Sequence, residues 1–151
     1  MRAGVVTLLA VGLFLIGASS LTADDKAEKD QEALQGTWQP ETINQAGQAA
    51  PAEALKEFTF LIKNNTYTLS VGGNELENGT FKLDSSKKPK TIDLEIQSGN
   101  DKGKKQPGIY ELEADTFKVC LAFPGESDRP KELVAKADTK TVSFVFKRQK
   151  K

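Results

Sequence analysis

The run TIDLEIQ, residues 91–97, decides the fold class, because apolar and polar side chains alternate along it without a break. Ile92, Leu94 and Ile96 point to one side of an extended chain, and the polar residues between them point to the other. A period of two residues is typical of a β-strand with one buried face. The run therefore predicts antiparallel β-structure, with one face against a core and the other in solvent.

The same period recurs along the chain, and turn residues such as Asn64-Asn65 and Gly72-Gly73 separate the runs. Strands are predicted over residues 37–43, 57–63, 66–71, 79–84, 91–97, 108–113, 116–123 and 141–148. A helical turn is expected at residues 51–56, and a short extra strand at residues 131–134.

Eight strands joined by short links favour an all-β fold, an eight-stranded antiparallel up-and-down barrel with a short N-terminal helical turn. Closing the sheet removes the unpaired edges that invite aggregation. The interior of such a barrel is filled by side chains or holds one small ligand. A two-layer β-sandwich is the alternative architecture.

The N-terminus has the three zones of a secretory signal peptide. Arg2 supplies a positive charge, an uncharged apolar run covers residues 5–16, and small residues lead to Ala23. Because this run is shorter than the ~20 residues that cross a bilayer, cleavage after Ala23 or after Ser20 is expected. The domains are then a signal peptide at residues 1–23, a polar linker at 24–33 and a barrel domain at 34–151. We expect an exported protein, periplasmic or extracellular, with no stable membrane span after cleavage.

Composition excludes several functions. The 21 basic and 21 acidic residues balance, which gives no electrostatic case for binding nucleic acid or an anionic membrane. Histidine is absent and Cys120 is the one cysteine, so Ser-His-Asp and Cys-His pairs, His-ligated metals and an internal disulfide are all excluded. We therefore expect no enzyme, no metal and no cofactor, and a domain whose stability depends on its hydrophobic core.

The tripeptide Gly36-Thr37-Trp38 opens the first predicted strand. It resembles the G-x-W signature of lipocalins and related calycin barrels. The resemblance implies that Trp38 closes the base of the barrel and that a basic residue of the last strand lies across its ring. Arg148 has the right parity for that cation–π contact. Gly36, Trp38 and Arg148 are therefore the expected residues of barrel closure.

Further blocks extend the resemblance over nearly the whole mature chain. They are LQGTW at 34–38, GTFKLD at 79–84, KKPKTIDL at 87–94, GIYEL at 108–112, CLA at 120–122 and RP at 129–130. Together they resemble a family of small exported planctomycete proteins, domains of unknown function with a lipocalin-like fold. The resemblance implies a lipocalin-like barrel and export, and it supplies no catalytic or ligand-binding residues.

Six aromatic side chains are expected to point into the barrel: Phe58, Phe60, Tyr67, Phe81, Tyr110 and Phe144. They either fill it as core or line a small apolar pocket. The predicted function is accordingly the binding of a small apolar ligand. The alternative is a structural or protein-interaction module of the cell envelope, which uses an exposed patch on the outer strand faces.

Three further groups are candidate sites outside the predicted core. Cys120 is either a thiol made reactive by Lys118 or a small residue half-covered by a neighbouring strand. Asp93, Glu95 and the acidic residues of 108–113 fit calcium binding or glycoside hydrolysis, or a solvent-facing alternation of charge. The Lys-rich loops at 87–90 and 102–105 either recognise an anionic polymer or stay solvated.

Overall fold

The computed structural model describes residues 22–150. The predicted signal peptide therefore lies outside the described residues, apart from its last two positions. The elements are α1 (Ala23–Leu34), β1 (Gly36–Gln45), β2 (Gln48–Ala49), α2 (Ala52–Glu57), β3 (Phe58–Lys63), β4 (Thr66–Val71), β5 (Asn74–Asp84), β6 (Lys90–Ile96), β7 (Lys105–Glu113), β8 (Thr116–Ala122) and β9 (Thr141–Arg148).

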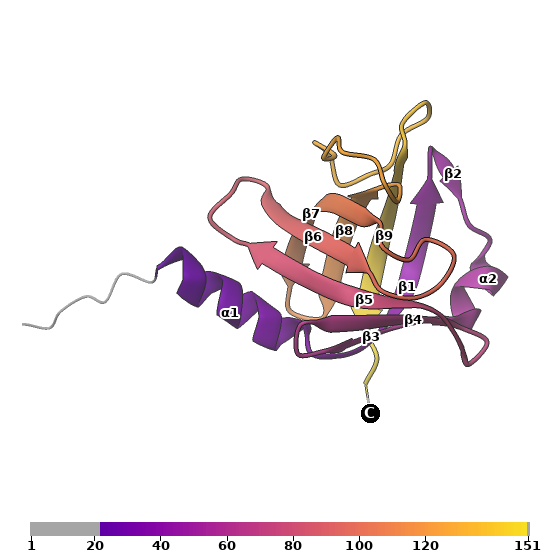
Figure 1. The fold of residues 1–151 in the computed structure, drawn as a ribbon. Helices are drawn as coiled ribbons and strands as arrows, with labels where there is room; N and C mark the ends of the chain where they lie inside the picture. Colours follow the sequence, from indigo (N-terminus) through magenta and orange to yellow (C-terminus); the bar gives the residue numbers. More distant parts are fainter. Residues whose placement is uncertain (1–21, 151) are drawn as a thin grey trace, which may run out of the picture.

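Eight of these strands form a closed antiparallel barrel (Figure 1). Strand β1 and strands β3 to β9 pair in chain order, and β9 returns to pair with β1 from Trp38 opposite Arg148 to Gln45 opposite Val142. The two-residue strand β2 lies beside the end of β1. The closure confirms the predicted all-β barrel, and the sandwich alternative is wrong.

Strand β6 follows the alternation that predicted it, with Ile92, Leu94 and Ile96 buried and the residues between them exposed. Strands β5 and β7 begin earlier in the chain than their sequence patterns suggested. Strand β5 begins at Asn74, five residues before the predicted start, and β7 begins at Lys105. Residues 74–78 are polar except for Leu76, and residues 105–107 are Lys-Gln-Pro, so neither extension shows the apolar alternation of a strand. Backbone pairing with β4 and β6 holds them in the sheet.

The predicted polar linker at residues 24–33 is wrong, because these residues form most of helix α1. The Thr22 hydroxyl accepts a hydrogen bond from the Asp25 N–H, and the Asp25 carboxylate accepts one from the Thr22 N–H, which is a capping box. The predicted helical turn at residues 51–56 is confirmed as α2. The predicted short N-terminal helical turn is confirmed as part of α1, which is 12 residues long. Because residues 24–33 lack an apolar stripe, sequence periodicity did not reveal the full length of this helix.

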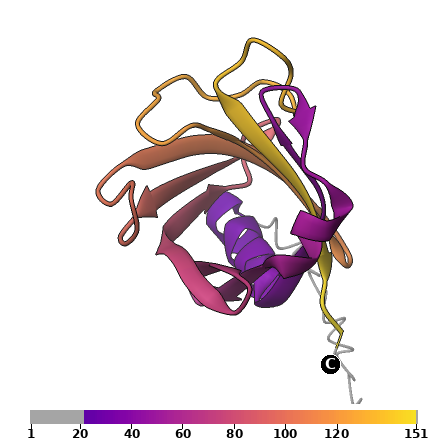
Figure 2. The same ribbon diagram turned by 90° about the vertical axis from the view of Figure 1, so that its right-hand side faces the viewer.

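Helix α1 covers one end of the barrel. Figure 2 looks through the ring of strands, and α1 is seen within its outline. Its last residue, Leu34, is fully buried in the core. The Asp30 carboxylate accepts hydrogen bonds from the Tyr110 hydroxyl, at 2.6 Å, and from the Lys90 ammonium, at 2.8 Å. Burial and this contact with Asp30 raise the pKa of Tyr110. These contacts fix α1 to β6 and β7, and we call this the closed end.

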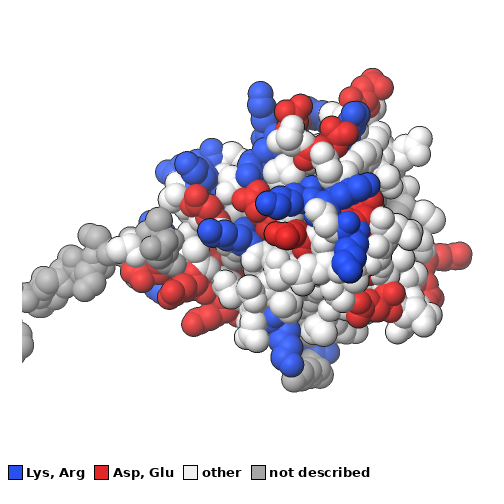
Figure 3. All heavy atoms as spheres, in the orientation of Figure 1, with Lys and Arg blue, Asp and Glu red and all other residues white. Residues whose placement is uncertain are grey.

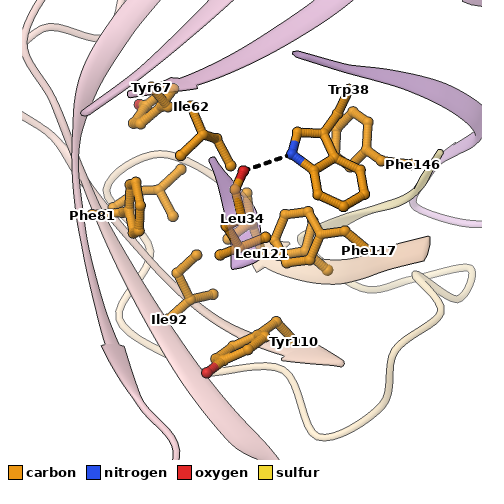
Figure 4. Close-up of a cluster of buried hydrophobic side chains, with 12 residues drawn as sticks. Leu34, Trp38, Ile62, Tyr67, Phe81, Ile92, Tyr110, Phe117, Leu121 and Phe146 are labelled. Carbon is orange, nitrogen blue, oxygen red and sulfur yellow. Dashed lines mark hydrogen bonds between the residues drawn. The ribbon is translucent and has the colours of Figure 1, made fainter. Parts of the chain in front are cut away.

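The core lies inside the barrel and extends to the closed end, where Leu34 and Trp38 are fully buried. Figure 4 shows Leu34 at its centre, with Trp38 donating its indole N–H to the Leu34 carbonyl at 2.8 Å. The buried members are Leu34, Trp38, Ile62, Tyr67, Phe81, Ile92, Leu94, Tyr110, Phe117, Val119, Leu121 and Phe146. They come from α1 and all eight barrel strands, so one apolar cluster holds the whole ring together.

The predicted extra strand at residues 131–134 is wrong, because this stretch pairs with no strand. Instead, Leu133 and Ala135 pack against Ile109 and Cys120 on the outside of β7 and β8. The Ala135 N–H donates to the buried Ser143 hydroxyl at 3.0 Å. The apolar pair at 133–134 suggested a strand, but an apolar side chain such as Leu133 can be buried against the outer face of the barrel without strand pairing.

Candidate functional site

A cavity of about 120 Å³ lies inside the barrel at the end opposite α1. Its mouth is formed where β8 ends and β9 begins, since Pro124 and Val142 are among its lining residues. The lining is Phe60, Leu69, Glu77, Ile92, Leu94, Gln106, Phe117, Val119, Leu121, Pro124, Val142, Phe144 and Phe146. All of these are apolar except Glu77 and Gln106, so the cavity offers a largely apolar environment.

The six aromatic residues expected in the interior are divided by depth. Phe60 and Phe144 line the cavity. Tyr67, Phe81 and Tyr110 lie in the packed core and do not line it. Phe58 begins β3 and belongs to neither group. Alternation along a strand predicts whether a side chain points into or out of the barrel. It does not predict where along the barrel axis the packed core ends and the cavity begins.

Stacked rings build one wall of the cavity. The Phe146 ring stacks on Phe60 at 5.1 Å between centroids, on Phe144 at 5.2 Å and on Phe117 at 5.9 Å. Such ring pairs stabilise by about 0.5–1.5 kcal/mol beyond the area they bury. Phe117 and Phe146 were absent from the expected site, although they share the inward parity of Phe144, which could have found them.

Glu77 is the one charged residue on the cavity lining within the described chain. Its carboxylate accepts a hydrogen bond from the Tyr67 hydroxyl at 2.8 Å. Burial raises the pKa of the Glu77 carboxyl, the Tyr67 hydrogen bond opposes this rise, and the charge of Asp101 adds to it. Glu77 was absent from the predicted site because the strand was expected to start at residue 79, yet Glu77 keeps the parity of Phe81.

A β-bulge determines which acidic residue reaches the cavity. Leu69 on β4 lies opposite Glu77, whereas the next residue, Ser70, lies opposite Glu75. The extra residue on β5 is Leu76, which is 52% exposed. A bulge bends its strand and re-aims the side chains beside it. Glu75 is thereby turned outward, where its carboxylate accepts a hydrogen bond from the Asn78 amide.

Gln106 supplies the other polar group of the lining. It is buried, and its side-chain amide donates to the Ala122 carbonyl at 3.0 Å. That bond joins β7 to the end of β8 beside the mouth of the cavity. The amide N–H is therefore engaged by the protein itself, which leaves Glu77 as the charged feature that a ligand would meet.

The residues expected to close the barrel lie together at the closed end. The Arg148 guanidinium lies over the Trp38 ring, 4.3 Å from its centroid. It also donates to the carbonyls of Gln35, at 2.7 Å, and Ala33. Gly36 has φ +120°, and a Cβ there would lie 3.5 Å from the Arg148 guanidinium. The guanidinium thus joins the last strand to the end of α1.

Cys120 lies on the outer face of β8 and is 1% exposed. Leu133 and Ala135 cover it, and burial raises the pKa of its thiol. Since the thiolate is the reactive form, the interpretation of Cys120 as a reactive thiol receives no support.

We expect native protein to react with a thiol reagent such as Ellman's reagent at least about 100-fold more slowly than unfolded protein, because labelling requires local opening. Absorbance stopped-flow measurements with and without denaturant give the two rates. A Leu133→Ala variant, which thins the cover over Cys120, should label faster than the wild type. Equal rates for native and unfolded protein would contradict the buried position.

A wide groove of about 890 Å³ lies on the outside of the barrel, between the hairpin that joins β5 to β6 and residues 129–131. Its charged lining residues are Lys82, Asp84, Lys87, Lys88, Asp93, Arg129 and Lys131. Figure 3 shows basic and acidic side chains mixed over this side of the molecule. Basic groups predominate in the groove, which includes Lys87 and Lys88 of the predicted Lys-rich loop.

Arg129 fixes one wall of this groove. Its guanidinium donates to the Gly108 carbonyl at 2.7 Å and to the Ile92 carbonyl at 3.2 Å, and it pairs with Asp93 at 2.7 Å. The acidic residues predicted on the outer face are not brought together. Within the described residues, no group of three or more Asp, Glu or Cys side chains is placed to hold a metal ion.

Comparisons with protein-family models, curated proteins and solved structures found no match. Neither α1 nor α2, the helices of the described part of the chain, is long and apolar enough to cross a membrane. The fold and the cavity define the class of protein: a closed eight-stranded antiparallel β-barrel with a helix across one end and a small, largely apolar cavity at the other.

Proposed function

We propose that this chain is an exported, non-enzymatic, lipocalin-like barrel that binds a small apolar ligand in the cavity opposite α1. The cavity itself is the observation that carries the proposal. An apolar cavity of about 150 Å³ engineered into another protein binds benzene, so about 120 Å³ suits a single ring or the end of an alkyl chain. The stacked rings of Phe60, Phe144 and Phe146 keep this space preformed.

The chemistry of the lining favours binding over catalysis. Apart from Glu77 and Gln106, the side chains that surround the cavity carry no group able to transfer a proton or attack a substrate. The Gln106 amide donates within the barrel. A preformed apolar space with one polar contact is typical of a ligand-binding site.

Toluene is a suitable probe, and filling the cavity should exclude it. We expect Val142→Phe to weaken toluene binding about tenfold or more, because the larger side chain occupies the mouth. Binding is measured by toluene-induced shifts of the methyl NMR signals of Leu69, Val119 and Leu121. Val145→Phe is the matched control, since Val145 lies on the outer face of the same strand opposite Lys118. Wild-type protein whose cavity methyl signals stay unchanged up to the solubility limit of toluene would refute the proposal.

Export is part of the proposal, and α1 bears on the cleavage point. Thr22 caps α1, so cleavage after Ser20 would keep the capping box and cleavage after Ala23 would remove it. This supports the cut after Ser20. The mass of the protein purified from its own host distinguishes a chain that begins at Leu21 from one that begins at Asp24. A mature protein that keeps Met1 would contradict export by cleavage.

The outer groove favours a second candidate function, a cell-envelope module that binds an acidic partner protein. Its basic side chains Lys82, Lys87, Lys88 and Lys131 line one continuous surface. Clusters of one charge attract partners of opposite charge and increase their rate of association. A photo-cross-linker at position 87 should capture an acidic partner in the host envelope, and Lys87→Glu with Lys88→Glu should abolish that capture. Exclusive recovery of uncross-linked monomer would refute this function.

A further inference from the structure

Glu77 lies in a row of side chains that crosses three strands. Phe60 on β3 is the direct partner of Leu69 on β4, and Leu69 is the direct partner of Glu77 on β5. Directly opposed side chains in an antiparallel sheet have Cβ atoms about 5 Å apart. All three residues line the cavity. The Glu77 carboxylate is therefore set beside an aromatic ring and an aliphatic side chain, at the edge of an apolar space.

The carboxylate has no cationic partner within the described chain, where none of the ion pairs involves Glu77. Its hydrogen bond comes from the neutral Tyr67 hydroxyl. A carboxylate has two oxygens that accept about four hydrogen bonds, so most of its capacity remains for a ligand. Burial raises the pKa of Glu77, since an apolar environment disfavours its charged form. A cation placed beside it would restore the favourable interaction that burial removes.

The number of carboxylates restricts the charge and size of such a cation. The bulge at Leu76 turns Glu75 to the outside, so one carboxylate faces the cavity and not two. Divalent metal ions take six or more oxygen ligands or several charged ones, which a single carboxylate among phenylalanines does not provide. A monovalent organic cation needs one anion and gains from aromatic neighbours such as Phe60. Its apolar part would fill the rest of the cavity.

We infer that the ligand class of this cavity is a small apolar ammonium compound. Its charged nitrogen binds the Glu77 carboxylate, and its ring or alkyl group packs against Phe144 and Phe146. This inference rests on the proposed function, because it names the chemical class of the ligand that the same cavity takes. It also assigns Glu77 a role beyond satisfying the Tyr67 hydroxyl.

Three probes of nearly equal shape test the inference: benzylamine, benzyl alcohol and toluene. Binding to the full mature protein is followed at mildly alkaline pH through the methyl NMR signals of Leu69 and Val142. Benzylamine should bind about tenfold or more tightly than benzyl alcohol, because a charge-assisted hydrogen bond is about twice as strong as a neutral one. In Glu77→Gln this preference should disappear.

The control variants separate charge from structure. Gln at position 77 can still accept the Tyr67 hydrogen bond, so the fold is retained and an unchanged methyl spectrum verifies it. Glu75→Gln removes the same charge two residues away, outside the cavity, and should leave the benzylamine preference intact. Toluene binding without a benzylamine preference would overturn the ammonium inference and leave the proposed function standing. Failure of all three probes to bind wild-type protein would overturn both, and a preference that persists in Glu77→Gln would overturn the role of Glu77.

Discussion

Trp38→Ala is expected to lower the free energy of unfolding by about 3–5 kcal/mol, the range found for removal of a buried large aromatic side chain. Trp38 is fully buried and its ring packs against Phe117 at 5.8 Å between centroids. Its indole N–H satisfies the Leu34 carbonyl, and its ring face carries the Arg148 guanidinium. Alanine removes these contacts together and leaves a void at the closed end.

Chemical denaturation followed by far-UV circular dichroism measures this loss, since the variant has no tryptophan to report by fluorescence. Trp38→Phe is the matched control. It keeps an apolar ring but leaves the buried Leu34 carbonyl without its donor, and an unsatisfied buried group costs about 1–3 kcal/mol. We therefore expect Trp38→Phe to fall between Trp38→Ala and the wild type. An alanine variant within about 1 kcal/mol of the wild type would show that the closed end does not support the barrel.

Gly79→Ala is expected to lower the free energy of unfolding by about 3 kcal/mol, at the upper end of the range for overpacked sites. A Cβ at this position would lie 2.2 Å from the Glu95 carbonyl oxygen and 2.9 Å from the Tyr67 ring and hydroxyl. The Glu95 oxygen belongs to the backbone of β6, which pairs with β5, and it cannot retreat without disturbing that pairing. The absence of a side chain at Gly79 makes the space that Tyr67 occupies.

The same variant should affect the cavity, because displacement of Tyr67 disturbs the hydrogen bond to Glu77. Denaturation curves give the loss of stability, and the methyl signal of Leu69, opposite Glu77, reports the change at the cavity. Thr80→Ala is the control, since Thr80 is the neighbouring residue on the other face of β5, and it should cost less than about 1 kcal/mol. A Gly79→Ala protein as stable as Thr80→Ala would contradict the close approach of these two strands.

The two predictions test different parts of one barrel. Trp38 lies where α1 and the last strand seal the closed end. Gly79 lies beneath Tyr67, at the boundary between the packed core and the cavity. Because the buried cluster holds α1 and all eight barrel strands together, the end opposite α1 can contain a cavity without loss of the fold. The barrel can therefore be stable and still contain a preformed cavity.

Local sequence determined the strands and the direction of their side chains. Alternation at residues 91–97 is a property of neighbouring residues, and β6 has the burial pattern that it predicted. The same parity put Phe60 and Phe144 inside the barrel and Arg148 on the side of Trp38. Closure of the sheet into a barrel could be predicted from the number of strands, because closing the sheet removes its unpaired edges. The absence of histidine, a property of composition alone, limited the chemistry that the chain can perform.

Tertiary structure alone decided the features that depend on contacts between distant segments. Helix α1 is held in place by the burial of Leu34 and by the hydrogen bond between Asp30 and Tyr110. The polar sequence of residues 24–33 does not reveal these contacts. Leu133 covers Cys120 on the outer face, although strand alternation assigns that face to solvent. The height at which core gives way to cavity, and the bulge that selects Glu77 over Glu75, arise from packing and pairing register. Periodicity within one strand predicts which of its faces is apolar. The position of a side chain in the barrel also depends on the strands that pair and pack with it, which are distant in sequence.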